Sequence, residues 1–331
     1  MRSFYSSSRC SDSLLFVWFL IAVFGIASFL SSGVEASSAT TEASSYQHFT
    51  EGLLFDKLGE YERATDAYRR ALSVDSSAWD IHYHLALDYL RLKDFKNAER
   101  EFLRLLKLKP YEERVRYLLA LAYSYHSKYD KAAYQFHELL KRPLLELNEQ
   151  YIRNALGYLY LTQEKLEKAQ TEYETVLKGD PNNSDAHFYL GYIYAERTDF
   201  DKAIKEFTKT IELDASNAAA LNSLSYIYAE RGERLDQAFA LIKRALEIEP
   251  SNGAFLDTLG WVYFKKGDLY NARRSLENAS VFMKNAEVFD HLGDVYVQLG
   301  MVAEARKNWQ VALEIDPTRK QVREKIRQLK K

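Results

Sequence analysis

The sequence predicts an all-α fold, a solenoid of about eight helix-turn-helix units closed by a C-terminal capping helix. One residue pattern recurs about every 34 residues, and such a period is typical of helical repeat proteins. Small and aromatic residues keep fixed spacings within that pattern. The 331 residues include only 13 Gly and 5 Pro against 47% hydrophobic residues. Few breakers therefore interrupt the helices, and the chain has ample material for a core.

The first element is an N-terminal export segment, residues 1–36. Arg2 and Arg9 precede an uncharged apolar run at residues 14–30, and small residues up to Ala36 follow it. A basic start, an apolar run and a small-residue exit are the layout of a secretory signal peptide. The run is long for a signal peptide and close to the lower limit for a spanning helix, so two alternatives stay open: cleavage after Ala36, or a retained inner-membrane anchor. Both place the rest of the chain outside the cytoplasm.

The repeat units begin after a short polar segment, residues 37–44, which we expect to be a flexible tether. Each unit carries one alanine in the same register, and a small residue twelve positions before it in most units. The alanines are Ala64, Ala98, Ala132, Ala169, Ala203, Ala238, Ala272 and Ala305. The small residues are Gly52, Ala86, Ala120, Gly157, Gly191, Ser225, Gly260 and Gly293. We expect both sets where the two helices of a unit cross most closely, because no large side chain fits there.

Aromatic residues follow the small residues by three positions and are expected to fill the wedge between the helices. Prolines such as Pro110, Pro181 and Pro250 mark the ends of units, since proline cannot continue a helix but is tolerated in the first turn of the next one. The predicted organisation is units 1–3 at residues 45–146, an insertion at 147–149, units 4–8 at 150–319 and a basic capping helix at 320–331.

These residues resemble the tetratricopeptide repeat family over residues 45–319. The resemblance implies a right-handed superhelical solenoid of paired antiparallel helices whose concave surface binds proteins or peptides. The stretches LGW at 259–261 and HLG at 291–293 are similar to the C-terminal repeats of bacterial envelope proteins of this family. Some of those are lipoprotein adaptors of carboxy-terminal processing proteases. The chain departs from them because its one cysteine, Cys10, precedes the apolar run, whereas a lipoprotein cysteine follows it.

Enzyme chemistry is not indicated by any motif. The 7 histidines fall in different units without HExxH spacing or cysteine partners, so no metal site is expected. Phosphate-binding GxxxxGK loops and GxSxG elbows are also missing from the sequence. We therefore expect no catalytic residue and no cofactor. With 45 basic and 47 acidic residues, the chain has no positive field for nucleic acid.

The candidate binding residues lie three positions before and one position after the small residue of each unit. By register these positions face the concave groove, where aromatic rings supply contact area and Asn or Asp supply hydrogen bonds. They are Phe49, Tyr83, Tyr117, Asn154, Tyr158, Phe188, Tyr192, Asn222, Tyr226, Asp257, Trp261, Asp290 and Asp294. The alternative is that individual rings only fill space between neighbouring first helices. Trp261 is expected to point to the groove, and Tyr263 into the interior.

The sequence thus predicts an exported scaffold or adaptor that binds protein or peptide partners, extended or helical, in a bacterial cell-envelope assembly. Two alternatives are a periplasmic assembly chaperone for an envelope substrate and a regulatory adaptor of an envelope protease. The aspartates at the C-terminal end of the groove favour a basic partner segment, or they form only a solvated acidic face. Membrane contact is expected mainly through a retained N-terminal anchor.

Overall fold

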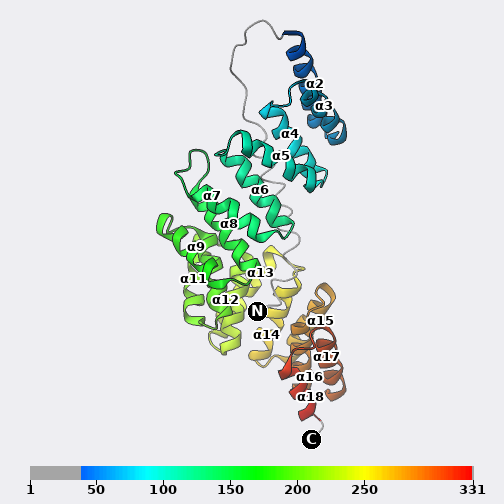
Figure 1. The fold of residues 1–331 in the computed structure, drawn as a ribbon. Helices are drawn as coiled ribbons and strands as arrows, with labels where there is room; N and C mark the ends of the chain where they lie inside the picture. The colour runs from blue at the N-terminus through cyan, green and yellow to red at the C-terminus, as the bar shows by residue number, and fades with distance from the viewer. Residues whose placement is uncertain (1–38, 330–331) are drawn as a thin grey trace. The chain divides into compact units, whose positions relative to one another are not determined.

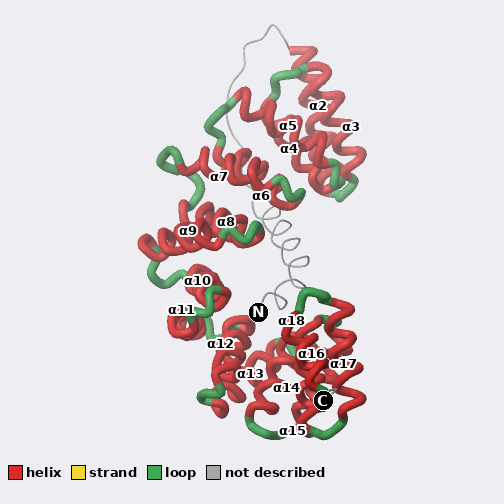
Figure 2. The backbone as a smooth tube through the Cα atoms, turned by 60° about the horizontal axis from the view of Figure 1, so that its bottom comes forward, coloured by secondary structure: helices red, strands yellow, loops and turns green. Residues whose placement is uncertain are grey.

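A computed structural model describes residues 39–329 of the chain, and the predicted export segment lies outside them. Over the described residues the chain forms seventeen α-helices and no strand (Figures 1 and 2). The first nine helices are α2 (Ala39–Lys57), α3 (Tyr61–Val74), α4 (Trp79–Arg91), α5 (Phe95–Leu108), α6 (Glu113–Tyr125), α7 (Tyr129–Leu140), α8 (Glu149–Thr162), α9 (Leu166–Gly179) and α10 (Ser184–Glu196). The remainder are α11 (Phe200–Leu213), α12 (Ala218–Arg231), α13 (Leu235–Ile248), α14 (Gly253–Lys265), α15 (Leu269–Phe282), α16 (Ala286–Gln298), α17 (Val302–Ile315) and α18 (Lys320–Gln328).

The described chain divides into two compact units, residues 39–172 and 173–329, with the boundary inside α9. Within each unit, consecutive helices pack as pairs, and each pair packs on the next. Examples are α4 with α5 in the first unit and α14 with α15 in the second. We call the first helix of a pair helix A and the second helix B. The predicted solenoid of helix pairs is confirmed.

Short polar signals begin and end these helices. Asn or Asp side chains cap eight of the described helices at the N-terminus by accepting a backbone N–H, as Asn217 does for α12 and Asn252 for α14. Between helix A and helix B the chain passes through a residue with positive φ, which is glycine in α14–α15 (Gly267, φ 81°) but threonine in α10–α11 (Thr198, φ 60°). A tight left-handed turn of this kind reverses the chain within a few residues.

The small residues lie at the helix crossings, as predicted. A Cβ atom added to Gly191 would lie 2.8 Å from Cδ1 of Phe207, and one added to Gly260 would lie 2.5 Å from Cγ of Leu276. Both distances are shorter than carbon atoms tolerate, so only glycine admits this approach of helix A to helix B.

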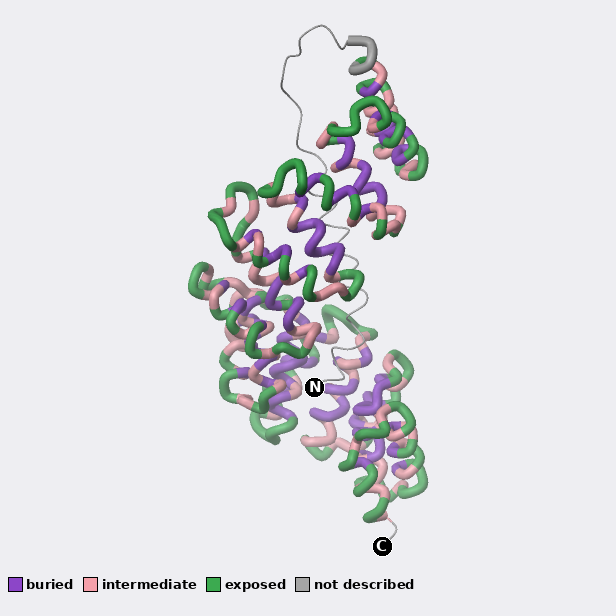
Figure 3. The backbone as a smooth tube through the Cα atoms, viewed as in Figure 1, coloured by how far each residue is buried: buried purple, intermediate pink, exposed green. Residues whose placement is uncertain are grey.

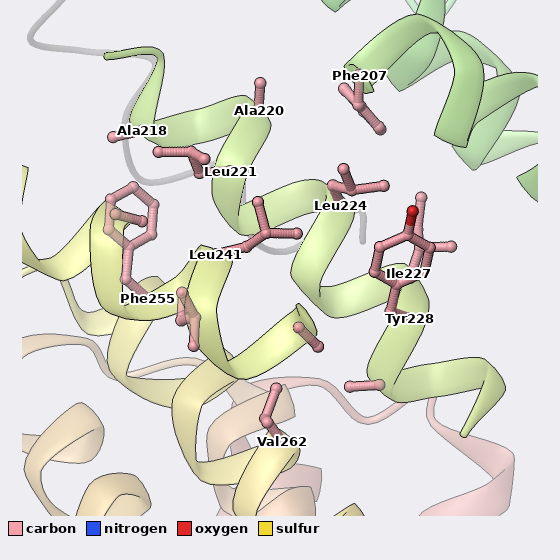
Figure 4. Packing of buried hydrophobic residues seen from close by; sticks show 14 of the residues in the cluster. Phe207, Ala218, Ala220, Leu221, Leu224, Ile227, Tyr228, Leu241, Phe255 and Val262 are labelled. Carbon is pink, nitrogen blue, oxygen red and sulfur yellow. The ribbon is translucent and has the colours of Figure 1, made fainter. Parts of the chain in front are cut away.

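Buried and exposed residues alternate along the helices, and the turns between helices are mostly exposed (Figure 3). In the second unit the largest cluster centres on α12, where Leu221, Leu224 and Ile227 are buried against residues of α11, α13 and α14 (Figure 4). Phe207 and Val262 belong to the same cluster. Because one continuous cluster joins three pairs, each pair depends on its neighbours for its core.

Two expected boundaries differ from the structure. Helix α2 begins at Ala39, so most of the segment expected to be a flexible tether is helical. Alanine and glutamate there favour a helix, and the segment has no glycine or proline to break it. The insertion expected at 147–149 is not a separate element: Leu147 and Asn148 belong to a longer loop between α7 and α8, and Glu149 is the first residue of α8. The capping helix is confirmed as α18, with Val322 buried and Ile326 and Leu329 partly buried.

The longer loop is held by side chains of α6. The Glu113 carboxylate accepts the backbone N–H groups of Leu145, Glu146 and Leu147 at 2.7, 3.0 and 3.0 Å. Burial raises the pKa of Glu113, but these three hydrogen bonds outweigh it and hold that pKa below its usual value. The Arg114 guanidinium adds an ion pair to Glu146 at 2.8 Å. The insertion is therefore an ordered part of the fold.

Candidate partner-binding face

The thirteen predicted residues all lie on helices A, but they differ in exposure. We call the side of each helix A that carries them the helix A face. Six of them are less than 9% exposed: Tyr117, Phe188, Asn222, Asp257, Trp261 and Asp290. Tyr158 is exposed, and six are half-buried: Phe49, Tyr83, Asn154, Tyr192, Tyr226 and Asp294. Burial limits what the first group can offer a partner, and their binding role stays a prediction.

Trp261 is buried, contrary to the expected orientation. Its indole is 7% exposed, and it stacks on the His291 ring with centroids 4.1 Å apart and planes 16° apart. Its Nε1–H donates to the Glu230 carboxylate at 2.8 Å. The indole also stacks on the Phe264 ring, with centroids 4.9 Å apart. Tyr263, which was expected inside, is half-buried and packs against the core cluster of α15 and α16. Trp261 is covered because α14 packs on the neighbouring helices A as well as on its own helix B.

Asp257 and His291 form a buried ion pair between α14 and α16. His291 Nδ1–H donates to both Asp257 oxygens, at 3.0 and 3.2 Å, and Asp257 has no exposed surface. Burial lowers the pKa of the His291 imidazole, but the Asp257 carboxylate outweighs it and raises that pKa to about 9. The ring is therefore an imidazolium at neutral pH. It presents a flat cation to Trp261, an arrangement that favours stacking.

Two further contacts tie the helices A of the second unit together. The Tyr226 hydroxyl on α12 donates to Glu287 on α16 at 3.0 Å. Lys325 of α18 donates to Asp290 and Asp294 of α16, each at 2.7 Å. The acidic end of the face, expected to meet a basic partner segment, thus already holds a lysine of this chain.

Two asparagines on the helix A face have an unused hydrogen-bond acceptor. The amide oxygens of Asn154 on α8 and Asn222 on α12 are buried, and neither accepts a hydrogen bond. A tyrosine follows each asparagine by four residues, Tyr158 and Tyr226, so each asparagine and its tyrosine lie on one face of their helix. The two helices belong to different units and carry the same pairing independently.

In residues 39–172 the predicted aromatic residues contact other rings. Phe49 lies against Tyr68 with centroids 5.9 Å apart, and Tyr117 meets Phe136 at the same distance. Tyr83 stacks on Trp79, with centroids 5.3 Å apart and planes 10° apart. Tyr117 is 5% exposed and contacts Phe136 of α7, so its ring fills space within its own helix pair and not between neighbouring helices A.

Sequence reasoning missed the residues that contact Trp261, Asp290 and Asp294 but do not occupy the positions three before or one after the small residue of a unit. His291 and Glu230 were not singled out as contacts, and Lys325 was seen only as part of a basic tail. A signal was present in the spacing: Glu230 precedes Trp261 by 31 residues, and Asp294 precedes Lys325 by the same number. That spacing is close to one repeat, so it joins successive helices A.

Within residues 39–329, no cluster of three or more His, Cys, Asp or Glu side chains has the arrangement of a metal site. No helix of that range is long and apolar enough to cross a membrane.

Comparison with known proteins gives one family. The sequence profile described as tetratricopeptide repeat matches residues 49–113, 154–208 and 195–253. A search of curated proteins found no significant match.

Several solved structures share the fold at low identity. A tetratricopeptide repeat protein from Parabacteroides merdae is similar with a TM-score of 0.59 and 16% identity, over 76% of this chain and 99% of that chain. The APC/C hetero-tetramer Cut9–Hcn1 is similar with a TM-score of 0.55 and 18% identity, over 86% of this chain and 69% of that chain. Pseudomonas aeruginosa pilF is similar with a TM-score of 0.51 and 19% identity, over 65% of this chain and 96% of that chain. At these identities the similarity establishes the fold alone.

Proposed function

Because this chain belongs to the tetratricopeptide repeat family, whose members bind protein or peptide partners, we propose that it is an adaptor that holds an extended peptide segment of a partner on its helix A face. One observation carries the proposal: the buried amide oxygen of Asn222 accepts no hydrogen bond, and Asn154 repeats this on a second helix. A buried acceptor without a donor costs about 1–3 kcal/mol, so a ligand that donates to it recovers that free energy.

The geometry favours an extended ligand over a helical one. In a helix the backbone N–H groups donate to the helix itself, whereas an extended segment leaves alternate N–H groups directed outward. One such N–H can donate to Asn222, and the side chains on either side then meet the half-buried rings of Tyr192 and Tyr226. Aromatic rings provide contact area at low conformational cost. The same description fits Asn154 and Tyr158 on α8.

We also propose that the adaptor acts in the cell envelope. The support is the order of basic start, apolar run and small-residue exit at residues 1–36. The solved relatives carry no argument for this setting, because their identities to this chain are too low.

The test uses Asn222→Leu, which keeps the side-chain size and removes the amide. Crosslinking in the source cell first identifies the partner segment, and a synthetic peptide of that segment then gives Kd. We expect Asn222→Leu to weaken binding by about tenfold or more, the equivalent of one lost hydrogen bond in a buried site. The matched control is Asn308→Leu on α17, a helix B position whose amide donates to Glu304 within its own helix. Equal affinity of wild type and Asn222→Leu, with unchanged thermal unfolding, would refute the proposal.

A further inference from the structure

The last helix, α18, occupies on α16 the place that a following helix A occupies in the other pairs. It lies against α16 and α17 (Figures 1 and 2). Lys325 reaches Asp294 and Asp290, which precede it by 31 and 35 residues. The contact from Trp261 back to Glu230 spans 31 residues, and that from His291 back to Asp257 spans 34. The register of α18 is therefore that of a helix A.

Few buried side chains hold α18 in place. It has nine residues, and Val322 is the one that is buried. By contrast α16 buries eight residues, from Ala286 to Val295. A helix of nine residues does not form alone in water, so α18 depends on its contacts. Its main polar contact is also open to solvent, since the Lys325 side chain is 31% exposed.

The surface beneath α18 has a specific chemistry. Val322 packs in a cluster with Ala286, Trp309 and Ala312. Next to this apolar part lie the Asp290 and Asp294 carboxylates, and Lys325 Nζ lies 5.7 Å from the centroid of the Trp309 ring. A ligand for this surface needs an apolar residue and, three positions later, a lysine or arginine on the same helix face. It must be a basic amphipathic helix.

We propose that this surface of α16 and α17 is a docking site for a basic amphipathic helix of a partner protein, which displaces α18. Two observations support this occupant: the complementarity between two aspartates and a cation, and the helix of that composition that already lies there. Weak attachment of α18 makes exchange feasible, because elements with few buried contacts open first. The surface does not use Asn222, so it adds a second partner site to the proposed function.

The test uses the full chain and a fluorescent peptide of residues 318–331 as a surrogate for the partner helix. Lys325→Ala in the full chain removes the bonds that hold α18 and leaves both aspartates in place. We expect this variant to bind the peptide about tenfold more tightly than wild type, since two charge-assisted hydrogen bonds no longer oppose it. Adding Asp290→Asn and Asp294→Asn should abolish that binding, and a scrambled peptide of equal charge should not bind.

Hydrogen exchange on the full chain tests displacement directly. Bound peptide should speed amide exchange in residues 320–328 of wild type and leave α12 unchanged. Three results would overturn the proposal: equal affinity for wild type and Lys325→Ala, equal binding of the scrambled peptide, or unchanged exchange in α18 at saturating peptide. Circular dichroism confirms that each variant is folded. Asn222→Leu should bind this peptide as wild type does, so failure here is separate from failure of the proposed function.

Discussion

A charged histidine in the core of a repeat protein needs a compensating partner, and Asp257 supplies it to His291. The two side chains come from successive helices A, α14 and α16, so each pair contributes one half of the ion pair. Breaking such a pair by removing one charge is more destabilising than its net contribution suggests, because the other charge stays buried. The pair therefore fixes the register between two repeats as much as it stabilises them.

The first prediction concerns pH. The pKa of His291 is raised from 6.5 to about 9, so folding favours the protonated ring. Its contribution to stability is complete below pH 6.5 and is lost as the pH rises through 9, up to about 3 kcal/mol for a shift of this size. Urea denaturation from pH 6.5 to 9.5 should show this fall. Asp257→Asn should be less stable at pH 6.5 and should lack the slope. A wild-type profile that is flat over that range would contradict the assignment.

Residue by residue, the sequence predicted positions better than orientations. The spacing of Gly191 and Gly260 identifies the crossing points because sterics at a crossing act within one pair. Trp261 was misplaced because its surroundings come from α12 and α16, and register within one repeat does not describe packing between repeats. The unused amide oxygen of Asn222 also needed coordinates, and the binding role expected of this asparagine stays a prediction.

At the scale of the helix, the closeness of each crossing determines which substitutions the pair accepts. Helix α14 approaches α15 so closely that an added Cβ at Gly260 meets both Cγ of Leu276, at 2.5 Å, and the Ala272 carbonyl oxygen, at 3.2 Å. The leucine can rotate, but the backbone oxygen cannot move without shifting the helix. Gly267 lies on the same helix pair and has nothing within 4 Å of an added Cβ, but its φ is 81°.

The second prediction compares these two glycines. Gly260→Ala should lower the free energy of unfolding by about 1–3 kcal/mol, because the pair must separate to admit one methyl group. Gly267→Asn is the matched control and should cost a few tenths of a kcal/mol, because asparagine tolerates a left-handed turn and the turn has open space. Chemical denaturation measures both. Equal denaturation midpoints for Gly260→Ala and wild type would show that the crossing is looser than the structure indicates.

At the scale of the whole chain, the proposed envelope setting places no demand on cysteine chemistry. The chain has one cysteine, Cys10, which lies inside the export segment, so no disulfide can form within one chain. Every described helix pair is held by packing, hydrogen bonds and ion pairs. Such a fold does not depend on the redox state of its surroundings, so it is compatible with the proposed envelope setting.

The last prediction tests that crossing. A fusion of residues 1–45 to a reporter that is active only outside the cytoplasm should be active, because a basic start and an apolar run direct translocation. Leu20→Arg with Val23→Arg should abolish the activity, since each charge in the centre of an apolar segment costs about 2.5–3.5 kcal/mol on insertion. Sequencing the N-terminus of the exported protein separates the two alternatives: Ser37 as the first residue indicates cleavage, and an intact N-terminus indicates a retained anchor. If only a reporter that requires the cytoplasm is active, the envelope setting is wrong, while the peptide-binding role of Asn222 remains open to its own test.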